Sequence, residues 1–185
     1  MEKQTKLTRR GFITLSVLGA GGVCLLGRCT NPPLSRWRFI TEQESSLLDA
    51  LAEQIIPTDE WPGGRDAGVT GFIDMQLAGP YVRFQEAYRK GLMAIQESSK
   101  AKFQKRFEEI SWKDQTQFLQ TMESGKMEGA SWEKGFDRQF FWLIRDHSMQ
   151  GFYGSPRHGG NKNNISYKMM KLDYPVITGQ NRYNI

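Results

Sequence analysis

Two pairs of neighbouring residues are of types that could carry acid–base chemistry. Asp59 and Glu60 place two carboxyl groups side by side, and Asp146 directly precedes His147. Adjacent carboxylates in a loop rich in proline and glycine are typical of capping or solvated groups. Neighbours on a helix point in different directions, and no nucleophile motif accompanies the aspartate–histidine pair. Neither pair therefore predicts a catalytic centre.

The sequence gives as little support to a cofactor or metal site. The only histidines, His147 and His158, are too few and wrongly placed for a metal site, so a partnered or surface histidine is favoured. The only cysteines, Cys24 and Cys29, lie near the N-terminus. No Cys-x-x-Cys-His motif and no Gly-x-Gly-x-x-Gly after a strand is present, so we expect no attached haem and no Rossmann-type site. We therefore expect no catalytic residue, cofactor or metal ion in this chain.

Residues 1–33 have the character of an export signal. Arg9 and Arg10 precede Phe12 and a modest apolar stretch, which is typical of a twin-arginine signal peptide. The alternative is a membrane anchor. However, the stretch from Gly11 to Leu26 is shorter than the roughly 20 apolar residues that a spanning helix needs. The sequence therefore favours export by the twin-arginine pathway.

This leader has a physical consequence, because twin-arginine cargo usually crosses the membrane already folded, often with a cofactor inserted. A chain without an evident cofactor site does not need this route for itself. The simplest inference is that a partner carrying a cofactor travels with it. Three fates of the leader stay open: cleavage, lipidation at Cys29 within an imperfect lipoprotein motif, and retention.

The positive charge of the chain is concentrated in the leader. The net charge is +5, of which residues 1–30 contribute +4 and the rest of the chain +1. A body so close to neutral has no basic footprint for nucleic acid. We therefore exclude a nucleic-acid partner.

The body, residues 34–185, shows helical patterning without the strict alternation of half-buried strands. One helix should end before Pro57, and a turn-rich loop should follow it. We predict an all-α domain, a small irregular helical bundle with an aromatic-rich core. The predicted caps of its helices are Thr41 (in a capping box with Glu44), Thr70, Ser111 and Ser131. The predicted core residues include Leu47, Leu48, Leu51, Ile55, Phe72, Ile73, Leu77, Tyr81, Phe84, Tyr88, Leu92, Ile95, Phe103, Phe107, Ile110, Phe118, Leu119, Met122, Trp132, Phe136, Phe140, Leu143 and Ile144.

The last part of the chain has a different composition. The stretch from Gly151 to Gly160 holds four glycines and a proline, so we expect a long, irregular, glycine-rich C-terminal segment. Aromatic residues and arginine are favoured at interface hot spots, and glycine lets another backbone approach closely. A partner interface is slightly favoured over the alternative, a structural loop that caps the bundle. The candidate interface residues are Phe152, Tyr153, Arg157, Gly159, Gly160 and Asn161.

Several of these segments together resemble the gluconate 2-dehydrogenase subunit 3 family, the small subunit of periplasmic sugar dehydrogenases. Each segment is weak alone, but they follow one another in the family's order through nearly the whole body. They are the twin-arginine leader, Ala52–Glu60, Pro62–Gly64 with Ala67–Val69, Phe72–Asp74, Phe140–Phe141, Gly151–Gly154 and His158–Asn161.

The resemblance implies a three-part enzyme at the periplasmic side of the inner membrane. A large FAD-dependent flavoprotein of the GMC type oxidises a sugar or sugar acid, and a multihaem cytochrome c, where present, carries electrons on through haem c. The small subunit has no established catalytic residues. The family implies that it binds and stabilises the large subunit and supplies its export signal, with membrane association through the complex or the leader.

Two other functions stay open at this point. One is a free-standing periplasmic enzyme that hydrolyses a lactone with the Asp59–Glu60 loop. The other is a binding module for a different partner in the cell envelope.

Overall fold

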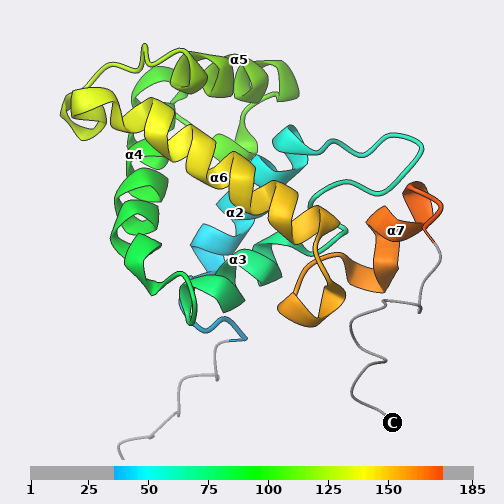
Figure 1. Cartoon of the computed structure of the whole chain (residues 1–185). Coiled ribbons are helices and arrows are strands. Elements are labelled where there is room, and N and C mark those ends of the chain that lie inside the picture. The colour runs from blue at the N-terminus through cyan, green and yellow to red at the C-terminus, as the bar shows by residue number, and fades with distance from the viewer. Residues whose placement is uncertain (1–35, 173–185) are drawn as a thin grey trace, which may run out of the picture. The chain divides into compact units, whose positions relative to one another are not determined.

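A computed structural model describes residues 36–172 of the chain (Figure 1). Within that range the chain forms α-helices and short 3-10 helices and no β-strand, which confirms the all-α prediction. The leader residues Arg9, Arg10, Phe12 and Cys29 lie outside the described residues. The α-helices are α2 (Glu42–Ile55), α3 (Val69–Leu77), α4 (Gln85–Phe103), α5 (Trp112–Glu123), α6 (Phe136–Tyr153) and α7 (Ile165–Met169). The 3-10 helices are η1 (Val82–Phe84), η2 (Phe107–Glu109), η3 (Ala130–Gly135), η4 (Pro156–His158) and η5 (Lys162–Asn164).

Helix α2 follows the sequence prediction closely. The Thr41 hydroxyl accepts a hydrogen bond from the backbone N–H of Glu44, whose carboxylate accepts one from the N–H of Thr41. This capping box satisfies two N–H groups that have no partner within the helix. The helix ends at Ile55, ahead of Pro57, and Leu47, Leu48 and Leu51 are buried on its inner face, all as predicted.

Two of the predicted caps are wrong. Helix α3 begins one residue before Thr70, after Gly68 with a φ of 75°, and the buried Thr70 hydroxyl donates to Asp49 Oδ1 at 2.5 Å instead. Ser131 lies within η3, and its hydroxyl donates to the carboxylate of Glu97 at 3.0 Å. In both places a glycine in the left-handed region begins the helix, because it can turn the chain where another residue would be strained.

The start of helix α4 is a third difference. Tyr81 and Phe84 share the helical spacing of Tyr88, yet they precede the helix in a turn and in η1, and α4 begins at Gln85. Both rings still pack against the core, so their burial follows the prediction while the helix start does not.

A buried carboxylate attaches the first described residues to the bundle. Asp74 of α3 accepts hydrogen bonds from the backbone N–H groups of Arg38, Phe39 and Ile40, at 2.9, 2.8 and 3.0 Å respectively. A carboxylate that accepts several N–H groups makes strong, charge-assisted hydrogen bonds. Asp74 therefore fixes the point at which the chain enters α2.

Helix α6 crosses the front of the bundle in Figure 1, over α2 and α3, with α4 to one side and α5 above. Its inner face buries Phe140, Ile144 and Phe152. The Phe140 ring lies so close to Gly91 of α4 that a Cβ at that glycine would be 2.2 Å from it. The two helices thus approach where one has no side chain. No helix among residues 36–172 has the length and apolar character that a bilayer span requires.

Candidate partner interface

The glycine-rich segment begins inside a helix. Gly151, Phe152 and Tyr153 form the last turn of α6, so the prediction of irregular structure is wrong for these three residues. The chain then passes through η4 and η5 into α7. Three asparagines in this stretch, Asn161, Asn163 and Asn164, have a backbone φ in the left-handed region. We call residues 154–166 the C-terminal cap.

Half of the candidate interface residues face inward. The Phe152 side chain is 1% exposed, and Gly160 and Asn161 are buried. A Cβ at Gly160 would lie 2.1 Å from the carbonyl oxygen of Gly151, and one at Gly159 would lie 3.1 Å from that of Gly71. Phe152 is therefore a core residue and not a partner anchor. The two glycines allow the cap to approach α6 and α3 of the same chain, which corrects their predicted role at a partner surface.

Asn161 fastens the cap from within. Its side-chain amide donates to the carbonyl of Gly154 at 2.8 Å, and its Oδ1 accepts from the N–H of Ser166 at 3.0 Å. The next residue, Lys162, donates its N–H to the carbonyl of Ala67 at 2.9 Å, which joins the cap to the loop before α3. These hydrogen bonds hold the cap against the rest of the same chain, so the capping alternative is correct for its inner side.

The outward residues of the segment remain candidates for partner contact. Tyr153 is 38% exposed, and Arg157 and His158 are exposed and hydrogen-bonded to each other, Nε to Nε2, at 3.0 Å. Beside them is a surface hollow of about 670 Å³ whose lining includes Tyr81, Met149, Tyr153 and His158. An aromatic ring and a guanidinium next to a hollow are the kind of groups that anchor interfaces.

His147 is buried on the inner face of the same helix, α6. Its Nδ1 lies 2.9 Å from the Tyr88 hydroxyl, and the Tyr81 ring stacks on the imidazole at a centroid distance of 4.7 Å. Burial lowers the pKa of His147 to about 4, so the ring is neutral at neutral pH. Asp146 points elsewhere and binds the Arg145 guanidinium at 2.8 Å. The structure thus agrees with a partnered histidine and forms no aspartate–histidine dyad here.

In the loop after α2, carboxylates accept hydrogen bonds from backbone N–H groups. Asp59 is exposed, and its carboxylate accepts the backbone N–H of Trp61 at 2.8 Å, as a turn-forming aspartate does. Glu53, which the sequence did not single out, accepts the N–H of Thr58 at 2.9 Å. Glu60 is exposed. This geometry adds no support to lactone hydrolysis at the Asp59–Glu60 loop.

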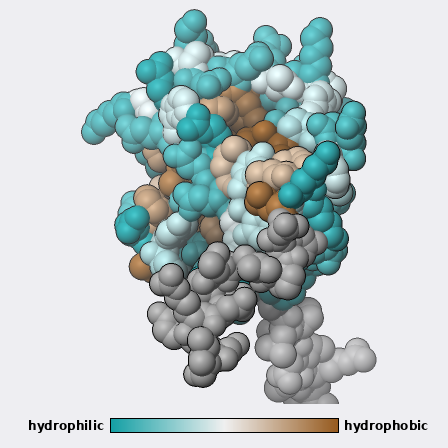
Figure 2. All heavy atoms as spheres, turned by 45° about the vertical axis from the view of Figure 1, so that its right-hand side comes forward, coloured by the Kyte–Doolittle hydropathy of each residue, from teal (hydrophilic) through white to brown (hydrophobic). Residues whose placement is uncertain are grey.

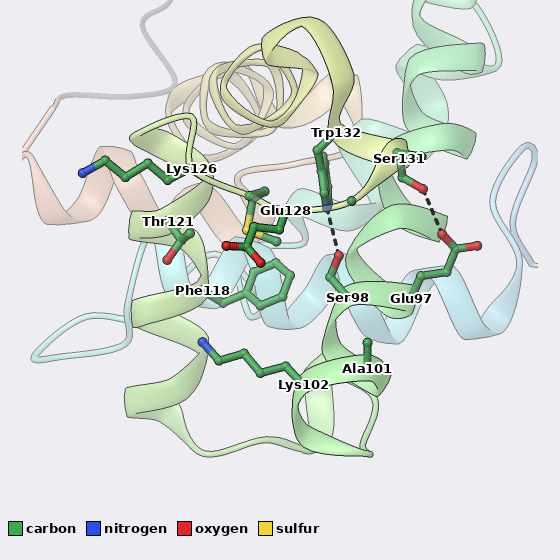
Figure 3. A pocket seen from close by; sticks show the side chains of 13 residues that line it. Glu97, Ser98, Ala101, Lys102, Phe118, Thr121, Lys126, Glu128, Ser131 and Trp132 are labelled. Carbon is green, nitrogen blue, oxygen red and sulfur yellow. Dashed lines mark hydrogen bonds between the residues drawn. The ribbon is translucent and has the colours of Figure 1, made fainter.

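A second hollow, of about 650 Å³, lies between α4, α5 and the segment that leads into η3 (Figure 3). The Trp132 indole N–H donates to the Ser98 hydroxyl at 2.8 Å across one wall, and Phe118 lies at the floor. Its rim carries two lysines, Lys102 and Lys126, and two glutamates, Glu97 and Glu128. The sequence did not predict this hollow because its walls come from three separate elements. Its balanced rim charge favours no ligand of either sign.

Residues 36–172 contain no group of three histidine, cysteine, aspartate or glutamate side chains placed to hold a metal ion. Tyr153 and Arg157, both exposed at or just beyond the end of α6, are the residues that stay candidates for partner contact.

Comparison with known proteins gives a family for the chain but no related solved structure. Neither the curated proteins nor the solved structures contain a match to the chain. The model of a family described as gluconate 2-dehydrogenase subunit 3 matches residues 42–173, from the start of α2 to just beyond the described residues. This match covers more than two thirds of the sequence. The chain therefore belongs to the gluconate 2-dehydrogenase subunit 3 family.

Proposed function

We propose that this chain is the non-catalytic small subunit of a periplasmic, membrane-associated, FAD-dependent dehydrogenase for a sugar or sugar acid. Family membership supports a place in a gluconate 2-dehydrogenase complex. The partner is the large, GMC-type flavoprotein, which holds the FAD and carries out the oxidation. A multihaem cytochrome c is the further partner where the complex passes electrons on.

The observation that supports the proposal is that two exposed side chains lie at or in a segment whose backbone is held in place. Tyr153 and Arg157 project from a segment whose backbone is held by Asn161 and by the close contact of Gly160 with Gly151. Anchors on a rigid segment lose little conformational freedom on binding, which favours a tight complex. Such a surface suits a subunit whose role is to bind and stabilise another protein.

The leader supplies the second part of the proposal. Arg9 and Arg10 direct export through the twin-arginine pathway, and the flavoprotein, folded around its FAD, crosses with this chain. The small subunit thereby serves as the export signal of the complex, which then remains at the periplasmic side of the inner membrane.

Affinity purification of the full chain from its native envelope tests the binding role. We expect a large chain with flavin absorbance to co-purify, while the small subunit separated from it is colourless and helical by circular dichroism. Recovery without any flavoprotein, or flavin or haem absorbance in the separated small subunit, overturns the proposal.

Replacing Arg9 and Arg10 together with lysine tests the export role. Both the small subunit and the flavoprotein should then stay in the cytoplasm, and periplasmic dehydrogenase activity should be lost. Normal periplasmic activity in that variant contradicts co-export.

A further inference from the structure

The outer face of α6 carries a line of exposed apolar side chains. Trp142, Met149 and Tyr153 are 38%, 41% and 38% exposed, although large apolar residues of a helix usually face the core. They are spaced by seven and four residues, which at 3.6 residues per turn places them within about 40° of one another around the helix. The line is about 17 Å long at 1.5 Å per residue. In Figure 1, α6 lies at the front of the bundle, and no other described helix crosses in front of it.

Each end of this line opens onto a hollow in the surface. Trp142 borders one of about 400 Å³ together with Gly125, Gly135 and Arg138. Met149 and Tyr153 border the hollow of about 670 Å³ described above. Such a surface can be complementary in shape to a partner protein. Side chains of the partner can fill the two hollows while the exposed side chains of α6 enter a groove of the partner.

Charge is distributed unevenly beside the line. On one side lie Arg138 and Arg145, and the Arg145 guanidinium rests 3.7 Å from the centroid of the Trp142 ring. On the other side the helical spacing places Gln139, Asp146 and Gln150. Arg157 adds a third cation beyond the end of α6. Asp146, the single exposed acid that this helix carries, is paired with Arg145 at 2.8 Å, so these four groups together keep a net charge of +2. A partner that matches this face is therefore acidic along one edge.

We infer that the outer face of α6 is the element that docks into the large subunit. It enters an apolar groove of the flavoprotein whose edge beside Arg138 and Arg145 is acidic. This inference rests on the proposed function and names the surface and the recognition mode within it. It moves the centre of the interface from the C-terminal cap to the helix before it, whose last residue, Tyr153, directly precedes the cap.

The observations favour a protein groove over a lipid surface. A helix that lies on a membrane has a wide apolar face with basic residues on its polar side. Here the apolar line is one residue wide, and the exposed Gln139, Asp146 and Gln150 border it closely. Such a narrow line matches the spaced anchors of a helix bound in a protein groove.

The test measures the dissociation constant of the purified complex made with full-length chains, following the flavin that elutes with the small subunit. The double variant Trp142→Ala/Met149→Ala should raise that constant at least ~30-fold, as loss of hot-spot side chains does. Arg145→Glu should raise it at least ~10-fold, and less so at high salt.

Matched controls come from the other helices. Trp112→Ala, Met93→Ala and Lys113→Glu remove exposed side chains of the same types from α5 and α4, where Trp112 is 51% and Met93 59% exposed. Each should change the constant less than ~3-fold, and melting temperatures should agree among all variants.

The outcomes separate this inference from the function on which it rests. If the wild-type chain brings down the flavoprotein and the α6 variants do so equally well, the docking face is wrong and the proposed function stands. If the wild-type chain brings down no flavoprotein, both fail. Loss of self-association in the α6 variants by light scattering, or loss of binding to anionic phospholipid vesicles, with the flavoprotein still bound normally, assigns the face to another occupant and overturns the inference.

Discussion

The C-terminal cap and the outer face of α6 meet at Tyr153, and they use the same kinds of residue in opposite ways. Phe152 at the end of α6 and Gly160 in the cap are buried, and glycine brings two backbones of one chain into contact. Along α6, Trp142 and Met149 are exposed.

The difference shows that composition alone does not identify an interface. A run of aromatic and glycine residues is equally compatible with internal packing and with partner contact, and only burial separates the two. In the view of Figure 2 the surface is mainly hydrophilic with apolar side chains emerging in a limited area, so exposed apolar groups are a minority that requires explanation.

The largest effect is expected in the cap, for Gly160→Ala. The added Cβ would meet the backbone carbonyl oxygen of Gly151 at 2.1 Å, and backbone atoms cannot move aside as a flexible side chain does. We expect the free energy of unfolding to fall by about 3 kcal/mol in chemical denaturation. The control is Gly135→Ala, at a φ of 73° with no atom within 4 Å, which should lose only about 1 kcal/mol. Equal losses at the two positions would show that the close contact does not matter.

The next largest effect on stability should come from His147, which is buried on the inner face of α6. Because burial lowers the pKa of His147 to about 4 from an unfolded value near 6.5, the unfolded chain binds more protons between these pH values. Stability should therefore be complete above pH ~6.5 and fall by about 2–3 kcal/mol as the pH drops toward ~4. His147→Gln should flatten this dependence, measured as unfolding free energy against pH. His158→Gln, at an exposed histidine, should leave it in place.

A smaller fall in the free energy of unfolding is expected for Asn161→Ala, because this variant leaves the carbonyl of Gly154 and the N–H of Ser166 without their hydrogen-bond partner. Two buried hydrogen bonds of this kind correspond to about 2 kcal/mol. Asn163→Ala is the matched control, since Asn163 has a similar φ of 56° but is exposed. The strain of alanine in the left-handed region is common to both variants, so the difference between their unfolding free energies measures the hydrogen bonds. No difference would mean that Asn161 does not fasten the cap.

The smallest effect on stability should come from the outer face of α6. Trp142→Ala and Tyr153→Ala each remove a side chain that is 38% exposed and has one aromatic ring contact within the subunit, with Phe141 and Phe152 respectively. The unfolding free energy of the isolated subunit should therefore fall by about 1 kcal/mol. A fall as large as that of Gly160→Ala would place these side chains in the packing of the subunit and remove the contrast between the two regions.

Sequence reasoning was most successful where one local signal determines the structure. The Thr41 capping box and Pro57 bound α2, Ser111 caps α5, and the apolar spacing identified Phe118 and Met122 as core residues. It failed at Thr70 and Ser131, where Gly68 and Gly135 start the helices through their backbone conformation while the hydroxyls bind distant carboxylates.

The candidate site was predictable only in outline for a related reason. Helical spacing continues from Phe140 through Ile144 to Phe152, so Phe152 could have been assigned to the core, and Trp142, Met149 and Tyr153 to the opposite face. The contact of Gly159 with Gly71 could not be predicted, because it depends on the position of α3, which is distant in the sequence. The contact of Gly160 with Gly151 could not be predicted either. The leader residues Arg9, Arg10 and Phe12 stay a prediction.

Asp74 has a consequence for the order in which the chain folds. The three N–H groups that it binds belong to Arg38, Phe39 and Ile40, which precede Asp74 by 36, 35 and 34 positions and lie at the start of the described residues. During synthesis these residues leave the ribosome well before Asp74, and they cannot be attached until α2 and α3 have been made and have come together. Closing such a loop carries an entropic penalty that only the assembled helices offset. The first described residues are therefore attached to the body late, after α2 and α3 have packed against each other.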